Sequence, residues 1–287
     1  MALKSILLDF SEFISSPDAG IASGETATQY GLAISPSNAA RCTDDYVRTV
    51  QFIRGAHQAI QCVLDQGVKK AHMLYVGCGP LAILLIPLII KFKDHKVRFT
   101  VVDIHQESIQ SVNAILHALS LDNRTINLIC GDAMNCVENL PEPPDVVLVE
   151  VMQAGLKTEP QVAVCRQVMQ NYPHALMVPE SIKLSIKWVN PEIEYSQESK
   201  NKASFRRNLG AVFTIDKKAI AGWSDKETST IPAANIDLPV DLDHSGVLQI
   251  FTEIDVFKGL LINEYQSGLT TPLNLKINLL DEKNVFY

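Results

Sequence analysis

The sequence predicts an α/β fold in which a parallel sheet flanked by helices is followed by an antiparallel, β-rich part. Short apolar strands alternate with helical stretches over residues 71–178, which is typical of a parallel sheet with helices on both faces. Beyond them, Ser181–Val189 alternates strictly between apolar and polar residues, as a half-buried antiparallel strand does. Residues 1–70 have mainly helical patterning. We therefore expect three parts, at residues 1–70, 71–178 and 179–287.

The first two parts have distinct element patterns. In residues 1–70, apolar residues recur at helical spacing, and Gly67 is a candidate helix stop; the recurring residues are Val50, Ile53, Ile60 and Val63. The strands expected in the second part are His72–Val76, Arg98–Val102, Ile126–Ile129 and Asp145–Val149. The helices expected there are Leu81–Phe92, Glu107–Leu119, a short one near Ala133–Asn139, and Pro160–Asn171.

The last part is expected to be barrel-like and antiparallel. Val247–Val256 and Leu273–Leu279 resemble Ser181–Val189 in their alternation, so all three are expected strands. Asn190–Asn201 and Gly222–Ala234 are polar and are expected to be connections.

Bulk composition excludes several classes of function. The chain has 287 residues and a net charge of −7, which argues against a broad nucleic-acid surface. Its six cysteines form no CxxC pair and no zinc-ligand spacing, so we expect reduced, buried thiols and no metal. Asp9 and Glu12 interrupt the short apolar N-terminal run, so no secretory signal is expected. The apolar stretch Leu81–Ile90 is half the roughly twenty residues that a membrane helix needs. We expect a cytoplasmic protein that binds neither membranes nor nucleic acid.

A glycine-rich turn follows the first strand of the second part. Gly77-Cys78-Gly79-Pro80-Leu81-Ala82 fits a relaxed dinucleotide-binding pattern. Glycine permits turns closed to other residues and lets a ligand approach the main chain. The helix expected after it would aim its N-terminal N–H groups at the same place. A nucleotide-like cofactor is the expected occupant.

Acidic residues at the following strand ends narrow the choice of cofactor. Asp103 closes the second strand, where a carboxylate can accept hydrogen bonds from ribose hydroxyls; the alternative is a helix N-cap. Asp132 and Ala133 follow the third strand, where a carboxylate can bind an adenine amino group. Glu150 ends the fourth strand, within reach of a transferred methyl group. These positions favour S-adenosylmethionine (SAM) over NAD, since no second mononucleotide-binding half follows.

This order of motifs resembles class I SAM-dependent methyltransferases over residues 71–178. The resemblance implies a Rossmann-like sheet, SAM as methyl donor and S-adenosylhomocysteine as product. Leu81 departs from the pattern, because the family commonly has a third glycine there. The cofactor-binding residues that the resemblance implies in this part are Gly77, Cys78, Gly79, Asp103, Asp132, Ala133 and Glu150.

Two further stretches are similar to protein arginine methyltransferases. Asp45-Tyr46-Val47-Arg48-Thr49 matches a segment whose arginine holds the methionine carboxylate of SAM in that family; the alternative for Arg48 is a solvated helix charge. Glu150 and Glu159 reproduce the nine-residue spacing of the family's "double-E" loop. Two carboxylates can grip a guanidinium from different sides and leave one nitrogen with a usable lone pair. Alternatively, Glu150 is a polar strand end and Glu159 caps the next helix.

The β-rich part resembles the same family less completely. Leu269-Thr270-Thr271-Pro272 is similar to the segment before the family's threonine-histidine-tryptophan motif, but that motif is absent, since neither Trp188 nor Trp223 follows a histidine. The substrate barrel must therefore be short or rearranged. No clear dimerisation arm is present, although Asn190–Ala234 could hold one in a homodimer.

The leading hypothesis is a SAM-dependent N-methyltransferase acting on a guanidino or amino group, with Glu150 as substrate orienter and Glu159 as its partner. A small-molecule acceptor, such as a free amino acid or natural-product precursor, fits the reduced architecture better than a protein or peptide. The alternatives are a small-molecule O- or carboxyl-methyltransferase, a protein arginine methyltransferase, an NAD(P) dehydrogenase and a catalytically dead binding subunit.

Overall fold

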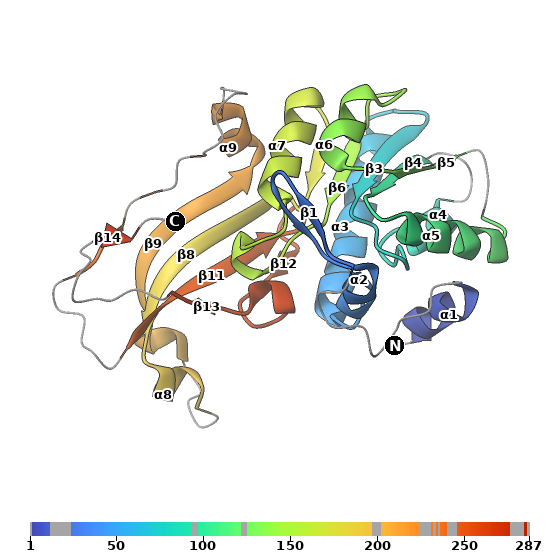
Figure 1. The fold of residues 1–287 in the computed structure, drawn as a ribbon. Helices are drawn as coiled ribbons and strands as arrows, with labels where there is room; N and C mark the ends of the chain where they lie inside the picture. The colour runs from blue at the N-terminus through green and yellow to red at the C-terminus, as the bar shows by residue number, and fades with distance from the viewer. Residues whose placement is uncertain are drawn as a thin grey trace.

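The computed structural model contains two main β-sheets, which lie on either side of the long helix α3 (Tyr46–Asp65) in Figure 1. The structure describes residues 2–11, 24–92, 97–121, 125–196, 202–223, 231, 234, 236–239, 246–275 and 284–285.

The first sheet is parallel throughout and has the strand order β5-β4-β3-β6-β7. Every residue of the central strands β3 and β6 is buried, as expected of a parallel sheet covered on both faces. The four strands expected in this region are confirmed to within one residue at either end. The sheet comprises β3 (Ala71–Val76), β4 (Val97–Asp103), β5 (Ile126–Cys130), β6 (Val146–Val149) and β7 (Leu176–Val178).

Helices connect these strands, and three of the four expected ones are present. They are α5 (Gln106–Ala118), α6 (Ala133–Cys136) with the 3-10 turn η1 (Val137–Asn139), and α7 (Gln161–Asn171). Apolar residues of α5 and α7, such as Val112 and Val168, are fully buried in the core formed with the sheet.

The prediction of a fourth helix at Leu81–Phe92 is wrong for the first half of that range. Helix α4 spans only Ile86–Lys91, and residues 81–85 form turns. Ala82 has a positive φ of 39°, which an α-helix does not allow. Pro87 lies in the first turn of α4, where its missing N–H costs no helical hydrogen bond. The glycine turn therefore leads into further turns rather than directly into a helix.

The N-terminal part contains helices and a hairpin that was not expected. The helices are α1 (Ala2–Phe10), α2 (Pro36–Cys42) and α3 (Tyr46–Asp65), and the hairpin pairs β1 (Thr26–Thr28) with β2 (Gly31–Ala33). Helix α3 carries the expected apolar spacing and ends just before Gly67, which has a φ of 91°. Glu12, invoked above against a signal sequence, lies outside the described residues.

The second sheet is antiparallel, with the order β12-β11-β8-β9 and β13 paired to β11. Its expected first strand is confirmed, since β8 spans Ser181–Val189 and buries Ile182, Leu184 and Ile186. The other members are β9 (Arg207–Asp216), β11 (Val247–Asp255), β12 (Leu261–Ile262) and β13 (Leu273–Asn274). Shorter elements are α8 (Pro191–Glu194), η3 (Lys202–Phe205), α9 (Lys217–Gly222), η4 (Gly268–Thr270) and the pair β10 (Ile236–Asp237) with β14 (Asn284–Val285).

Several expectations for this last part have mixed outcomes. The strand expected at Leu273–Leu279 is observed over two residues, and residues 276–279 lie outside the described part. Strand β9 was not expected, and the connection expected at Asn190–Asn201 contains helix α8. Most of the connection expected at Gly222–Ala234 lies outside the described residues.

The structure bears on two expectations drawn from composition, namely that the cysteines are reduced and buried and that no helix spans a membrane. All six cysteines are free, but burial is wrong for Cys130, which is exposed on the edge strand β5, and Cys42, Cys62 and Cys136 are only half-buried. Cys78 and Cys165 are buried. In the part of the chain that the structure describes, no helix is both long enough and apolar enough to cross a membrane.

The glycine turn supplies a test of the fold. A Cβ at Gly77 (φ 82°) would lie 2.4 Å from Val151 Cγ1 and 2.7 Å from the carbonyl oxygen of Glu150. Gly67 has a similar φ, but a Cβ there meets nothing within 4 Å. We expect Gly67→Ala to lower the free energy of unfolding by about 1–2 kcal/mol through backbone strain alone. Gly77→Ala should lower the free energy of unfolding by ~1–3 kcal/mol more than Gly67→Ala does, because its Cβ also overpacks against Val151 and Glu150. Urea unfolding of both variants measures the difference, and equal losses would contradict the close approach at Gly77.

Candidate active site

The predicted site residues gather at one edge of the parallel sheet. Gly77, Asp103, Asp132 and Glu150 each end or closely follow a strand, and the carboxyl ends of parallel strands share an edge. All four line one cavity of about 770 Å³. Arg48, Cys78, Gly79, Ala133 and Glu159 line it too, so the structure brings every predicted site residue together.

The glycine turn is held open by its backbone geometry and by Asp103. Gly77 and Gly79 have positive φ values of 82° and 59°, which favour glycine. The N–H of Gly79 donates to Asp103 Oδ2 at 2.8 Å, and the thiol of Cys78 lies 3.7 Å from the same oxygen. Burial raises the pKa of the Cys78 thiol well above its ordinary value, so it stays neutral.

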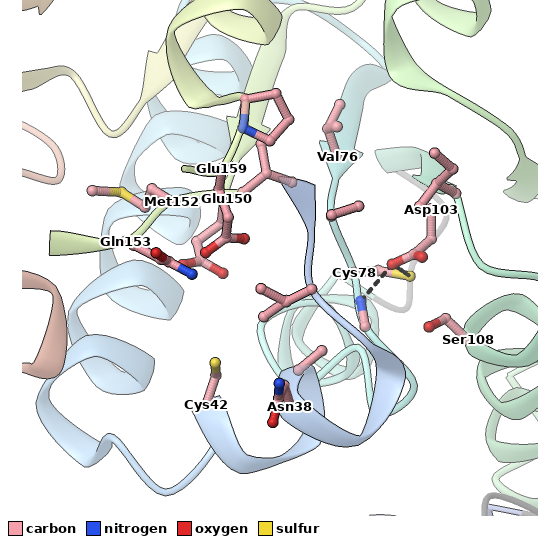
Figure 2. A pocket seen from close by; sticks show the side chains of 18 of the residues that line it. Asn38, Cys42, Val76, Cys78, Asp103, Ser108, Glu150, Met152, Gln153 and Glu159 are labelled. Atoms are coloured by element: carbon pink, nitrogen blue, oxygen red, sulfur yellow. Dashed lines mark hydrogen bonds between the residues drawn. The ribbon is translucent and has the colours of Figure 1, made fainter. Parts of the chain in front are cut away.

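Asp103 fixes the turn from the end of β4. Its other oxygen, Oδ1, accepts a hydrogen bond from the backbone N–H of His105 at 2.9 Å. His105, not Asp103, occupies the N-cap position of α5, so the helix-cap alternative for Asp103 is wrong. The side chain is 8% exposed and faces the cavity, opposite the two glutamates in Figure 2.

Asp132 has a local structural role as well as a place in the cavity wall. It is the N-cap of α6, with Oδ1 accepting from the N–H of Met134 at 2.9 Å. Ala133 follows it and is buried. One carboxylate oxygen of Asp132 is therefore used by the fold.

Arg48 and Glu150 form a buried, bidentate ion pair. Nε of Arg48 donates to Glu150 Oε1 at 2.9 Å, and Nη2 donates to Oε2. The two side chains are 10% and 5% exposed, so the alternative of a solvated charge at Arg48 is wrong. Burial raises the pKa of Glu150, and the guanidinium opposes this rise. Burial disfavours the charge on Arg48, but Glu150 outweighs that effect and its pKa is raised.

The Arg48 fork keeps hydrogen-bonding capacity for a ligand. Its third contact is from Nη1 to the carbonyl oxygen of Cys42, at 2.9 Å. A guanidinium has five N–H donors, so three contacts leave two N–H groups on the Nη atoms. A ligand carboxylate fits this remaining pair of donors.

Glu159 is a buried carboxylate beside that ion pair. Its carboxylate and that of Glu150 lie close together in Figure 2, and the residue is 8% exposed. Within the described ranges, no group donates a hydrogen bond to it. Burial, Glu150 and Glu25 raise its pKa to about 8, with Arg48 opposing. Since α7 begins at Gln161 with Pro160 as N-cap, Glu159 does not cap that helix.

Some wall residues were not predicted from the sequence. Glu25 and Thr28 come from the unexpected hairpin, which docks through a hydrogen bond from the N–H of Leu32 to the carbonyl oxygen of Thr158 at 2.8 Å. Leu269 lines the cavity because Asp45 holds the segment before it: Oδ2 accepts from Ser267 Oγ at 2.6 Å and from the N–H of Gly268 at 2.8 Å. No local sequence signal marks these contacts, since they join distant segments.

The residues present fit SAM on structural grounds. The backbone of the glycine turn lines the cavity, Asp103 supplies a carboxylate there, and Arg48 retains two donors. Among the described residues, the cavity included, no group of three or more His, Cys, Asp or Glu side chains is placed to hold a metal ion.

Solved structures share this architecture. The Trypanosoma brucei PRMT1 enzyme–prozyme heterotetrameric complex with AdoHcy superposes with a TM-score of 0.53 at 14% identity, over 82% of each chain. The chain has the fold of a protein arginine methyltransferase. Arabidopsis thaliana protein arginine methyltransferase 10 gives a TM-score of 0.49 at 14% identity, covering 74% of this chain and 71% of that one. No protein-family model and no curated protein matches the sequence.

The methyltransferase fold thus places a carboxyl group with a raised pKa in its cavity, and this affects stability. Between the ordinary value of 4.5 and about 8, the folded chain holds a proton at Glu159 that the unfolded chain does not. Stability from this group is therefore present at low pH and is lost as pH rises through about 8. Between pH 5 and pH 8, the free energy of unfolding of wild type should fall as the pH rises. We expect the fall for Glu159→Gln to be smaller by ~1–3 kcal/mol.

Urea unfolding at each pH measures this difference. Glu253→Gln is the matched control, because Glu253 is exposed on β11. Parallel curves for wild type and Glu159→Gln would contradict the raised pKa.

Proposed function

We propose that the protein is a SAM-dependent N-methyltransferase that methylates a guanidino or amino nitrogen. The observation that carries the proposal is Glu159, a buried carboxyl group that lies beside the Arg48–Glu150 pair and receives no hydrogen bond from the described residues. It shares its cavity with the glycine turn.

The charges of Arg48, Glu150 and Glu159 favour a cationic acceptor. Arg48 is paired with Glu150, so this corner of the cavity holds two carboxyl groups and one cation, and burial together with Glu150 raises the pKa of Glu159 to about 8. A guanidinium or ammonium group brings one positive charge and several N–H donors, so its binding would return Glu159 to the ionised form. A neutral hydroxyl acceptor brings no such charge.

The methyl donor would be held by other residues of the same cavity. Asp103 would accept hydrogen bonds from the ribose hydroxyls, Asp132 from the adenine amino group, and Arg48 would donate to the methionine carboxylate. When bound, SAM supplies an electrophilic methyl group whose sulfonium leaving group needs no acid.

The chain's own residues would position the acceptor and manage its proton. Holding the attacking nitrogen in line, about 3–3.5 Å from the reacting carbon, supplies much of the rate. Glu150 would orient the acceptor and draw its positive charge away from the attacking nitrogen. Glu159, returned to the ionised form by the bound cation, would be placed to take the proton that this nitrogen loses.

We further propose a small-molecule acceptor, such as a free amino acid or natural-product precursor, because the threonine-histidine-tryptophan motif of the arginine-methylating family is missing. Protein arginine methylation is the second candidate, favoured by the fold shared with the Trypanosoma brucei enzyme. The assembly state, including a homodimer, stays a prediction, as does a cytoplasmic location.

Cofactor binding provides the first test. Isothermal calorimetry of the purified protein with SAM and, separately, with NAD should detect binding of SAM alone. Asp103→Asn should weaken the affinity for SAM by about tenfold, because a charge-assisted hydrogen bond becomes a neutral one. Binding of NAD without SAM would refute the methyltransferase proposal and favour the dehydrogenase alternative.

Glu150 provides the test of acceptor chemistry. We expect Glu150→Gln to lower kcat for a guanidine or amine by about 100-fold or more, since the neutral amide cannot localise the acceptor's charge. The Kd for SAM should change far less than kcat, because the amide oxygen can still accept the hydrogen bond from Nε of Arg48. The measurement uses labelled SAM with free arginine, other amines, hydroxylated small molecules and arginine-rich peptides.

The acceptor panel separates the remaining alternatives, with Glu253→Gln as the control variant. Transfer to a hydroxylated compound would favour O-methylation, and transfer only to peptides would favour protein methylation. Binding of SAM without transfer to any acceptor would favour a dead subunit. A near wild-type rate for Glu150→Gln would show that the two-carboxylate mechanism is wrong.

A further inference from the structure

The buried side-chain amide of Gln161 hydrogen-bonds the backbone on both sides of Glu150. Gln161, the first residue of α7, is fully buried. Its Oε1 accepts a hydrogen bond from the N–H of Val151 at 3.0 Å, and its Nε2 donates to the carbonyl oxygen of Val149 at 3.0 Å. Nε2 also lies 3.3 Å from the sulfur of Cys165, one turn along the helix. The side chain thus grips the residues on both sides of Glu150.

Gln161 is also close to Glu159 along the chain. Gln161 follows Glu159 by two positions, with only Pro160 between them. We define residues 150–159 as the acidic loop. Gln161 therefore joins the two ends of this loop, and each end carries one of the paired carboxylates.

Other contacts fix the loop between its ends. The N–H of Gly155 donates to Oγ1 of Thr252 in β11 at 3.0 Å, and Thr158 Oγ1 lies 2.6 Å from Gln153 Oε1. These contacts hold the middle and the far half of the loop. Within the part of the chain that the structure describes, Gln161 is the side chain that bonds the backbone on both sides of Glu150.

We propose that Gln161 is a positioning residue for methyl transfer, whose amide sets the separation and orientation of the Glu150 and Glu159 carboxylates. This inference rests on the proposed function. An amide suits the position because it offers one acceptor and one donor side by side, matching an N–H and a carbonyl two residues apart.

Removing the amide would leave two buried backbone groups unpaired. Such groups are costly, so the loop would shift until water or another partner satisfied them. A shift of about 1 Å at a reacting group can lower a rate 100-fold. The effect should fall on the acceptor side, since the backbone that Gln161 holds carries Glu150 and leads to Glu159.

The direct test is Gln161→Met, which keeps the side-chain length and removes both hydrogen bonds. We expect kcat at saturating SAM to fall about 10–100-fold while the Kd for SAM stays near wild type. The matched control is Gln170→Met on the same helix, where a single 3.2 Å hydrogen bond to the carbonyl oxygen of Trp223 is lost far from the loop. The control should retain wild-type kcat.

Gln161→Glu adds a readout that a purely structural role would not produce. A protonated carboxyl group at this position repeats both hydrogen bonds, whereas an ionised one opposes the carbonyl oxygen of Val149. The titratable groups around it are Cys165 on α7, the glutamates at the loop ends, and Arg48 paired with Glu150. Relative to wild type, kcat of this variant should recover toward low pH, and Gln161→Met should show no such recovery.

The outcomes separate this inference from the proposed function. Loss of activity in Glu150→Gln with wild-type kcat in Gln161→Met overturns the role of Gln161 alone. Wild-type activity in Glu150→Gln overturns the proposed function. If no acceptor is methylated, the pKa of Glu159 is measured by carboxyl-carbon NMR instead. This pKa should differ from wild type in Gln161→Met and should equal it in Gln170→Met. An unchanged pKa in Gln161→Met overturns the inference. If Gln161→Met does not fold, Gln161→Glu at low pH supplies the same comparison.

Discussion

The buried ion pair between Arg48 and Glu150 is the contact on which the arrangement of the site depends. It joins the first turn of α3 to the end of the central strand β6. Such a pair adds little net stability, because both charges lose water, but removing one partner leaves an uncompensated charge. Asp45, at the N-cap of the same helix, binds Ser267 and Gly268 near the C-terminal sheet. One helical turn therefore links all three parts of the chain around the cavity.

The charges of the cavity give the site its chemical character. Arg48 satisfies one of two neighbouring carboxylates, and Glu159 remains with a pKa raised to about 8 by burial and by Glu150. A group held in this way is poised to bind a cation and to exchange a proton near neutral pH. Gln161 and Thr252 hydrogen-bond the backbone of the acidic loop, which carries both glutamates.

Strand patterning was predictable to within a residue because burial on both faces leaves a continuous apolar signal in β3 and β6. The helix after the glycine turn was misplaced, since apolar residues 81–85 are equally compatible with buried turns. The hairpin β1–β2 was missed because its three-residue strands are too short for an alternation to register. Gln161 carried no sequence signal, as its importance comes from two backbone groups ten and twelve residues earlier.

The sequence by itself determined the fold class and the candidate site residues, because parallel strands deliver their carboxyl ends to one edge whatever the loops between them do. Tertiary structure alone decided how those residues are paired. Arg48 turned out to bind Glu150 rather than water, and Glu159 receives no hydrogen bond from the residues that the structure describes. The physical reason is that pairing depends on distance and burial across about a hundred residues of chain, and neither quantity is written in local spacing.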